Sequence, residues 1–282
     1  MKLASLLACM CCAALTAIGQ MQAPSQGSLL SAFFGLDRSL RITIATRQTC
    51  GANPGTDGMP VIFSSEVDAS TLGPTDFRVK TTSGAIGDVR CATLQPADEP
   101  GELRTVLLIG QFGSVRDQPK QVEVVGDVLS RDGAINFRGA ATSVIPLEAG
   151  PTLILAETIE PSAWTVGGRG DCPGEGVKTI VRATWAGGVT RPDGGEIGTR
   201  EHQMYRVSIR KPDGGTVSVA PVSVGDLHDN DNNHELCLDV AGMASTVFFP
   251  AGALRDPNGD LNPDTQVAVS APRANGDAPA RK

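Results

Sequence analysis

Short segments in which apolar and polar residues alternate recur along most of the chain. They lie at residues 41–44, 77–80, 121–124, 205–209 and 216–219. A period of two is typical of antiparallel strands that bury one face. Turn signals separate these segments, among them Pro-Asp-Gly-Gly at 192–195 and again at 212–215, in which Pro fixes φ and Gly supplies a positive φ. No amphipathic helix of convincing length follows residue 40, and residues 28–36 suit either a short helix or a leading strand. The pattern therefore predicts an all-β fold.

The composition agrees with a turn-rich globular protein. The chain has 282 residues, with 33 glycines, 19 prolines and only 4% aromatic residues. Hydrophobic residues make up 40% and charged residues 20%, which excludes wholesale disorder and a polytopic membrane protein. The length suits one large domain or two ordinary ones.

The N-terminus has the features of a secretory signal peptide. Lys2 precedes an apolar run over residues 3–18, and the small residues Ala17 and Gly19 supply a cleavage site. We expect a signal peptide at residues 1–19, a leader at 20–39, and an exported protein of the periplasm, the cell surface or the extracellular space. A lipoprotein is the alternative, because Leu6-Leu7-Ala8-Cys9 resembles a lipobox, although the apolar stretch would then span only residues 3–8.

The net charge argues against nucleic acid and anionic lipid as partners. The formal charge is −7, and loss of Lys2 with the signal peptide would make it −8. An acidic surface without a cluster of Lys or Arg repels both polyanions. The mature chain has no apolar run long enough to span a membrane. We therefore expect a partner among envelope or extracellular proteins or glycans.

The two halves of the mature chain follow one plan. Three segments of the first half, at 59–63, 77–79 and 106–108, correspond to 178–185, 205–207 and 236–238. Each half then closes with a turn of leucine and acidic residues and a last strand, near 141–145 or 266–269. We infer a duplication, with β-sandwiches at 40–159 and 177–270 joined by a linker at 160–176 that is rich in Gly and Pro. Residues 271–282 would form a flexible tail.

Four cysteines remain in the mature chain, namely Cys50, Cys91, Cys172 and Cys237. An even number in an exported protein suggests disulfides. Three pairings can be drawn, and the repeat favours Cys50 with Cys91 and Cys172 with Cys237, because Cys50 and Cys172 each precede the first strand of their half. Buried free thiols are the alternative, which an oxidising compartment disfavours.

Part of the first half resembles a known family. The run Met-Pro-Val-Ile-Phe-Ser-Ser-Glu-Val-Asp at 59–68, followed by Asp-Phe-Arg-Val at 76–79, is similar to the opening of bacterial Ig-like domains of adhesins and surface-layer proteins. The turn at 254–259 is similar to a closing turn of these domains, with Asn and Gly in altered order. The resemblance is clearest over residues 59–80. It implies two tandem Ig-like β-sandwich domains in a surface or periplasmic setting, and it brings no catalytic residue.

Two acidic loops in the second half are candidates for binding calcium. The first alternates Asp229, Asp231, Asn233 and Glu235, and the second alternates Asp256, Asn258 and Asp260. Ca²⁺ takes six to eight oxygen ligands, and a loop with oxygens at alternate positions supplies several of them. Neither loop has the EF-hand pattern. The alternative is that Asp and Asn form turns by bonding their own backbone.

Other chemistry finds less support in the sequence. His228, His234 and Cys237 lie close enough along the chain to suggest zinc, but Cys237 is expected in a disulfide. The chain has no Gly-x-Ser-x-Gly elbow, dinucleotide fingerprint or phosphate-binding loop, so we predict no catalytic residue. We interpret the protein as an exported, non-enzymatic structural or adhesin-like binding module. The alternative is an extracytoplasmic glycan hydrolase using acidic residues or a bound metal, which convergence of the two acidic loops around an open cleft would favour.

Overall fold

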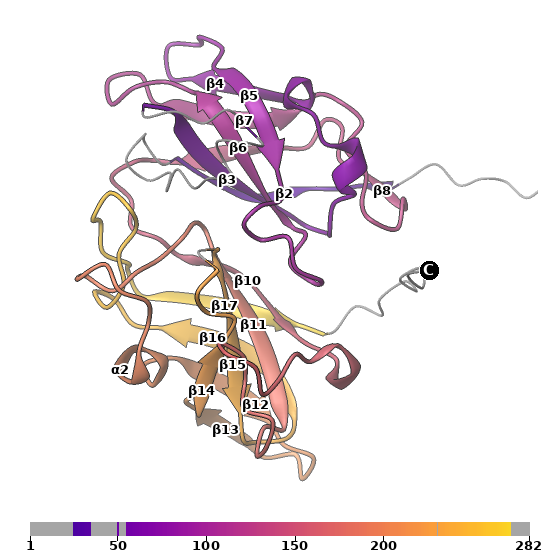
Figure 1. Ribbon diagram of the computed structural model, residues 1–282, viewed down its shortest axis with the longest axis vertical. Coiled ribbons are helices and arrows are strands. Elements are labelled where there is room, and N and C mark those ends of the chain that lie inside the picture. Colours follow the sequence, from indigo (N-terminus) through magenta and orange to yellow (C-terminus); the bar gives the residue numbers. More distant parts are fainter. Residues whose placement is uncertain (1–24, 35–49, 51–54, 230, 272–282) are drawn as a thin grey trace, which may run out of the picture.

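The computed structural model describes residues 25–34, 50, 55–229 and 231–271. The expected signal peptide, the alternating segment at 41–44 and residues 272–282 of the expected tail lie outside these ranges. Figure 1 shows two lobes, one above the other, which we call the first lobe (β1–β9) and the second lobe (β10–β17). Among the described residues, the helices are single turns such as α2 (Thr199–His202), and none has the length and apolar character needed to cross a membrane.

The first lobe contains a seven-stranded sheet in the order β4-β7-β9-β2-β3-β6-β5. Its strands are β2 (Leu29–Phe33), β3 (Asp57–Phe63), β4 (Phe77–Thr81), β5 (Asp88–Thr93), β6 (Thr105–Gln111), β7 (Pro119–Val124) and β9 (Ala141–Ile145). A separate parallel pair consists of β1 (Ser25–Gln26) and β8 (Ile135–Asn136). The last strand, β9, is antiparallel to β7 and parallel to β2. It therefore joins the two parts of the sheet.

The second lobe contains an eight-stranded sheet in the order β13-β12-β16-β17-β10-β11-β15-β14. Its strands are β10 (Leu153–Thr158), β11 (Thr179–Trp185), β12 (Arg206–Arg210), β13 (Thr216–Val219), β14 (Ser223–Gly225), β15 (Asn233–Leu238), β16 (Met243–Phe249) and β17 (Thr265–Ser270). Here the last strand, β17, is antiparallel to β16 and parallel to β10. Apart from the extra strand β13, the order repeats that of the first lobe.

Each sheet curls over its own apolar core. In the first lobe Val79 and Val122, from β4 and β7, share a buried cluster with Val61 of β3 and Leu108 of β6. In the second lobe the buried residues of β11, β12, β15 and β16 form another cluster, which contains Trp185, Tyr205 and Phe249. Strands from both parts of each sheet thus contribute to one core. Within the described residues, the two lobes have separate cores.

The alternating pattern predicted the strands well. The segments at 77–80, 121–124, 205–209 and 216–219 lie in or overlap β4, β7, β12 and β13. Residues 29–33, for which the sequence left helix and strand open, form β2. The second Pro-Asp-Gly-Gly turn joins β12 to β13, with Gly214 at φ 87° and a hydrogen bond of 2.8 Å from Lys211 N to Gly215 O. The strands that the sequence aligns between the halves occupy equivalent places in the two sheet orders.

Both predicted disulfides are present. Cys50 is bonded to Cys91 in the first lobe, and Cys172 to Cys237 in the second. Cys172 and Cys237 are buried, and Trp164 packs against their cluster. Each disulfide is therefore internal to one lobe, as the repeat suggested.

The segment that connects the two lobes is not the linker predicted at 160–176. The strand β10, which the sequence analysis assigned to the first sandwich, pairs with β11 and β17 of the second lobe. The strand β2, which was assigned to the N-terminal leader, pairs with β3 and β9 of the first lobe. The chain crosses between the sheets over residues 146–152, and residues 160–176 are a loop between β10 and β11.

Candidate functional site

Four poorly exposed charged residues form ion pairs of alternating polarity between the lobes. Arg104 of the first lobe places Nη2 2.9 Å from Oε1 of Glu157 in β10. Glu102, in the same loop, places Oε1 3.2 Å from Nε of Arg182 in β11. Glu157 and Arg182 are themselves partners in the register of β10 and β11. Acid and base therefore alternate around a square, which we call the charge square.

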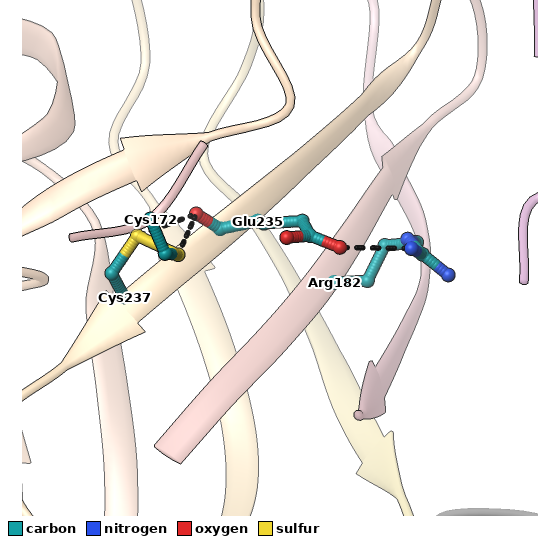
Figure 2. Close-up of a disulfide and its surroundings, with 4 residues drawn as sticks. All are labelled: Cys172, Arg182, Glu235 and Cys237. Carbon is teal, nitrogen blue, oxygen red and sulfur yellow. Dashed lines mark hydrogen bonds and ion pairs between the residues drawn. A yellow bond between two sulfur atoms is a disulfide. The ribbon is translucent and has the colours of Figure 1, made fainter. Parts of the chain in front are cut away.

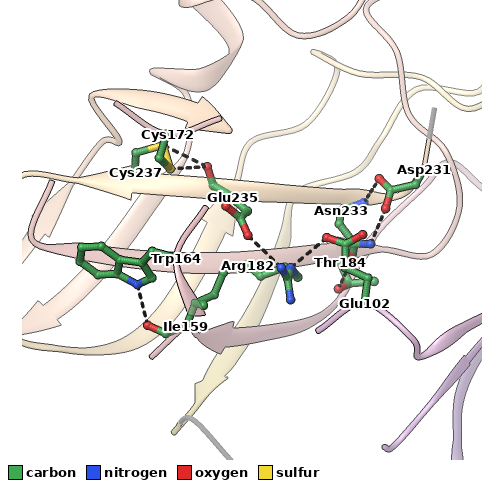
Figure 3. A network of polar contacts seen from close by, with 10 residues as sticks. All are labelled: Glu102, Ile159, Trp164, Cys172, Arg182, Thr184, Asp231, Asn233, Glu235 and Cys237. Atoms are coloured by element: carbon green, nitrogen blue, oxygen red, sulfur yellow. Dashed lines mark hydrogen bonds and ion pairs between the residues drawn. A yellow bond between two sulfur atoms is a disulfide. The ribbon is translucent and has the colours of Figure 1, made fainter. Parts of the chain in front are cut away.

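Arg182 has a second acidic partner within its own lobe. Its Nη2 donates a 2.8 Å hydrogen bond to Oε1 of Glu235 in β15, because the register of β11 and β15 sets these two residues opposite each other. Figure 2 shows this pair beside the disulfide between Cys172 and Cys237. Figure 3 shows Arg182 between the carboxylates of Glu235 and Glu102. The guanidinium of Arg182 thus forms ion pairs with two buried carboxylates.

An acidic pocket of about 390 Å³ lies where the lobes meet. Glu99 of the first lobe lines it together with residues 169–171 and 226–229 of the second. Two groups of three carboxylates lie here, and in each group one oxygen per residue is within 4.8 Å of the others. The first group is Glu99, Glu102 and Asp226, and the second is Asp226, Asp229 and Asp231. Asp226 therefore belongs to both groups, and the first contains residues of both lobes.

The loop between β14 and β15 carries its acids on an unusual backbone. Asp226 and His228 have φ values of 62° and 83°, in the left-handed region. Side chains other than Gly adopt this region at a cost of about 1 kcal/mol or more. The loop folds back so that Asp226, Asp229 and Asp231 come within reach of one another. Both left-handed residues line the pocket.

Three acids of the two carboxylate groups are held under conditions that oppose their ionisation. Burial raises the pKa of Glu102, and the carboxylates of Asp231 and Asp226 add to this although Arg182 lowers it. Burial also raises the pKa of Asp226 and of Asp231. For Asp231 the neighbouring carboxylates of Asp226 and Asp229 act in the same direction. Like charges in a poorly solvated place favour uptake of a proton or of another cation.

The structure brings together three of the four residues predicted in the first acidic loop. Asp229 and Asp231 belong to the second carboxylate group. Asn233 and Glu235 lie in β15. Asn233 Nδ2 donates a 2.6 Å hydrogen bond to Asp231 Oδ2, and its Oδ1 accepts a 2.8 Å hydrogen bond from Thr184 Oγ1. Glu235 instead pairs with Arg182. The register of β11 and β15 makes the pairs with Thr184 and Arg182, because it sets Thr184 opposite Asn233.

The second predicted loop is a separate turn. Asp256 Oδ1 accepts hydrogen bonds from the backbone N–H groups of Gly259 and Asp260, at 2.8 and 2.9 Å. Within the described residues, Asp256, Asn258 and Asp260 belong to neither group of three carboxylates. Convergence of the two loops around a cleft, which would have favoured the hydrolase alternative, therefore gains no support from the described residues. Calcium binding at this turn stays a prediction.

The zinc hypothesis is wrong for the residues that suggested it. Cys237 is bonded to Cys172, so it has no thiolate to offer a metal. His234 is buried, and its Nδ1 lies 2.7 Å from the hydroxyl of Tyr205. Tyr205 in turn accepts a 2.9 Å hydrogen bond from Trp185 Nε1. His234 therefore belongs to the core of the second lobe.

Sequence reasoning missed the contribution of the first lobe. Glu99 and Glu102 lie in an acidic turn between β5 and β6 that looks like any solvated loop. Arg182 offered a clearer signal, because it is a charged residue within the apolar run Thr-Ile-Val-Arg-Ala-Thr-Trp of β11. A charge in a buried strand requires a partner. That signal predicts a buried ion pair but does not identify the acid.

No protein-family model and no curated protein sequence matches the chain. Among solved structures, the N-terminal part of the bacterial S-layer protein SbsC matches with a TM-score of 0.28 and 9% identity, over 87% of this chain and 44% of that chain. A structure of SbsC domains 1–6 matches with a TM-score of 0.28 and 10% identity, over 88% and 41% of the two chains. The chain spans less than half the length of either SbsC chain. The strand pairing, rather than this similarity, carries the structural argument.

Proposed function

We propose that the protein is an exported, non-enzymatic structural or binding module made of two Ig-like β-sandwich domains. The observation that carries this proposal is that each lobe has the same order of seven strands and its own disulfide. Disulfides persist in oxidising compartments outside the cytosol. Paired sandwiches form a stiff unit whose end loops are free to bind a partner.

The strand orders support the Ig-like assignment. An Ig sandwich has strands A, B, E and D in one sheet and C, F and G in the other. Counted along the chain, β2-β3-β6-β5 corresponds to A-B-E-D, and β4-β7-β9 to C-F-G. In the second lobe β10-β11-β15-β14 and β12-β16-β17 correspond in the same way, with β13 as an added C′ strand. We propose domains at 25–145 and 153–270, which arose by duplication.

Export and envelope binding can be tested together. The full chain with a C-terminal tag is expressed in an exporting bacterium, and the cell fractions are assayed for the protein and for its free thiols. We expect oxidised protein outside the cytoplasm that binds isolated envelope saturably. A variant in which the four cysteines of the mature chain are replaced by serine should accumulate poorly. Reduced protein retained in the cytoplasm would contradict the proposal. Release of reducing sugars from envelope glycan would support the hydrolase alternative instead.

A further inference from the structure

Two carboxylates from different lobes lie close together, and each has a buried oxygen, although Asp226 also lines the pocket. Glu102 is 2% exposed, and its Oε2 is buried without a hydrogen-bond donor among the described residues. Oδ2 of Asp226 is likewise buried without a hydrogen-bond donor among the described residues. Oxygens of the two side chains lie within 4.8 Å of each other. A buried carboxylate that lacks a donor and is aimed at a second carboxylate requires a proton or a cation between them.

The charge of Arg182 does not balance this cluster. The two groups contain five carboxylates in all, and Arg182 contacts only Glu102 among them while also pairing with Glu235. Its Nε and Oε1 of Glu102 are 3.2 Å apart, but their alignment does not make a hydrogen bond. The pocket beside the cluster is partly open to solvent, and Arg169 is the only arginine or lysine among the residues that line it. A further positive charge therefore has both a reason to bind and a route of entry.

We propose that this cluster binds a calcium ion that bridges the two lobes, with Glu99 and Glu102 as ligands from the first lobe and Asp226 as the ligand from the second. Ca²⁺ prefers oxygen ligands at about 2.4 Å, so oxygens on opposite sides of the ion are about 4.8 Å apart. The ligand oxygens of each group fall within that spacing of one another. Mg²⁺ fits less well, because it demands a compact octahedron and keeps several waters.

The bridging ion deepens the proposed function. It rests on that function only in assuming a compartment in which calcium is plentiful. By neutralising acids of both lobes, the ion would hold them in one orientation and relieve the repulsion that adds to burial in raising the pKa values of Asp226 and Asp231. The competing explanation is a proton shared between Glu102 and Asp226, which needs no metal.

Calorimetric titration of the purified, oxidised, metal-free full chain tests the proposal. Near neutral pH we expect one site per chain with a submillimolar dissociation constant for CaCl₂. The melting temperature should rise by about 5 °C or more at about 100 times that constant, and equal MgCl₂ should give less than half of this rise. If neither heat nor a melting shift appears at millimolar calcium, the proton-shared pair is the correct explanation and the proposal fails.

Variants on the first lobe test whether the ion bridges. Glu99 is exposed, so Glu99→Gln should leave the metal-free melting temperature unchanged and weaken calcium binding about tenfold. Glu102→Gln should abolish the calcium-dependent rise, because it removes the buried first-lobe ligand that lies within 4.8 Å of Asp226. Asp239→Asn, at an exposed acid outside the cluster, is the control and should bind as the wild type does. Calcium affinity unchanged in both first-lobe variants would overturn the bridge, whether or not the protein is exported.

Discussion

Replacing Tyr205 with phenylalanine tests the reasoning about the core of the second lobe. The Tyr205 hydroxyl accepts a hydrogen bond from Trp185 Nε1 at 2.9 Å. Its own proton is therefore free to be donated to Nδ1 of His234, 2.7 Å away. Trp185 and Tyr205 are 0% exposed and His234 is 6% exposed. Loss of one oxygen would leave an indole N–H and an imidazole nitrogen buried without partners.

The expected magnitude follows from these two groups. A buried polar group without a partner costs about 1–3 kcal/mol, so Tyr205→Phe should lower the free energy of unfolding by about 3 kcal/mol. Trp164 and Trp185 are the only tryptophans of the chain, and both lie in the second lobe. Urea unfolding followed by tryptophan fluorescence therefore reports on the lobe that carries the substitution.

Two further variants make this result interpretable. Thr216→Val removes an exposed side-chain hydroxyl from β13 of the same lobe, and it should change the free energy of unfolding by less than about 0.5 kcal/mol. Adding His234→Leu to Tyr205→Phe should cost less than the two single changes together, because they share one hydrogen bond. A loss below about 1 kcal/mol for Tyr205→Phe would refute the interpretation that this chain of hydrogen bonds is sealed from water.

Three other changes probe the same lobe. Burial lowers the pKa of His234 to about 4 from an ordinary 6.5, so the free energy of unfolding should fall by up to about 3 kcal/mol as the pH falls between these values. His234→Gln should reduce this pH dependence in urea titrations, and an unchanged dependence of the unfolding free energy on pH would contradict the reasoning. The disulfide of Cys172 and Cys237 spans 65 residues and restricts the unfolded chain. Replacing both cysteines with serine should therefore lower the free energy of unfolding in urea by about 4 kcal/mol. A loss below about 1 kcal/mol would contradict this explanation. Arg182→Gln should lower stability by about 3 kcal/mol in thermal unfolding, because two buried acids lose their counter-charge; an unaltered melting temperature would mean that water reaches them.

The strands and disulfides could be predicted because their signals are local or repeated. The segment at 77–80 alternates because one face of β4 is buried. Cys50 and Cys172 hold matching positions before the first aligned strand of each half, which selected one pairing out of three. The place of β10 could not be predicted in this way. Its parallel partner β17 lies more than 100 residues away, and a short apolar run does not identify the sheet that it joins.

The residues of the candidate site likewise divide into those with a local signal in the sequence and those without one. The spacing of Asp229 and Asp231 suggested that they act together, and they share a group. The same spacing extended the set to Asn233 and Glu235. Asn233, where β15 begins, is hydrogen-bonded to Asp231, whereas the register sets Glu235 opposite Arg182. Glu102 is separated from Asp229 by more than 100 residues, so only the packing of the lobes brings it to the pocket.

The charge square explains why a protein of this kind would keep four ions in a poorly solvated junction. Buried ion pairs contribute little net stability compared with apolar packing. Their polarity, however, alternates: the first lobe presents Glu102 and Arg104, and the second presents Arg182 and Glu157. A sliding movement that exchanged the partners would set acid against acid and base against base, at a cost of several kcal/mol. The arrangement therefore selects one orientation of the lobes, which a stiff module needs more than additional stability.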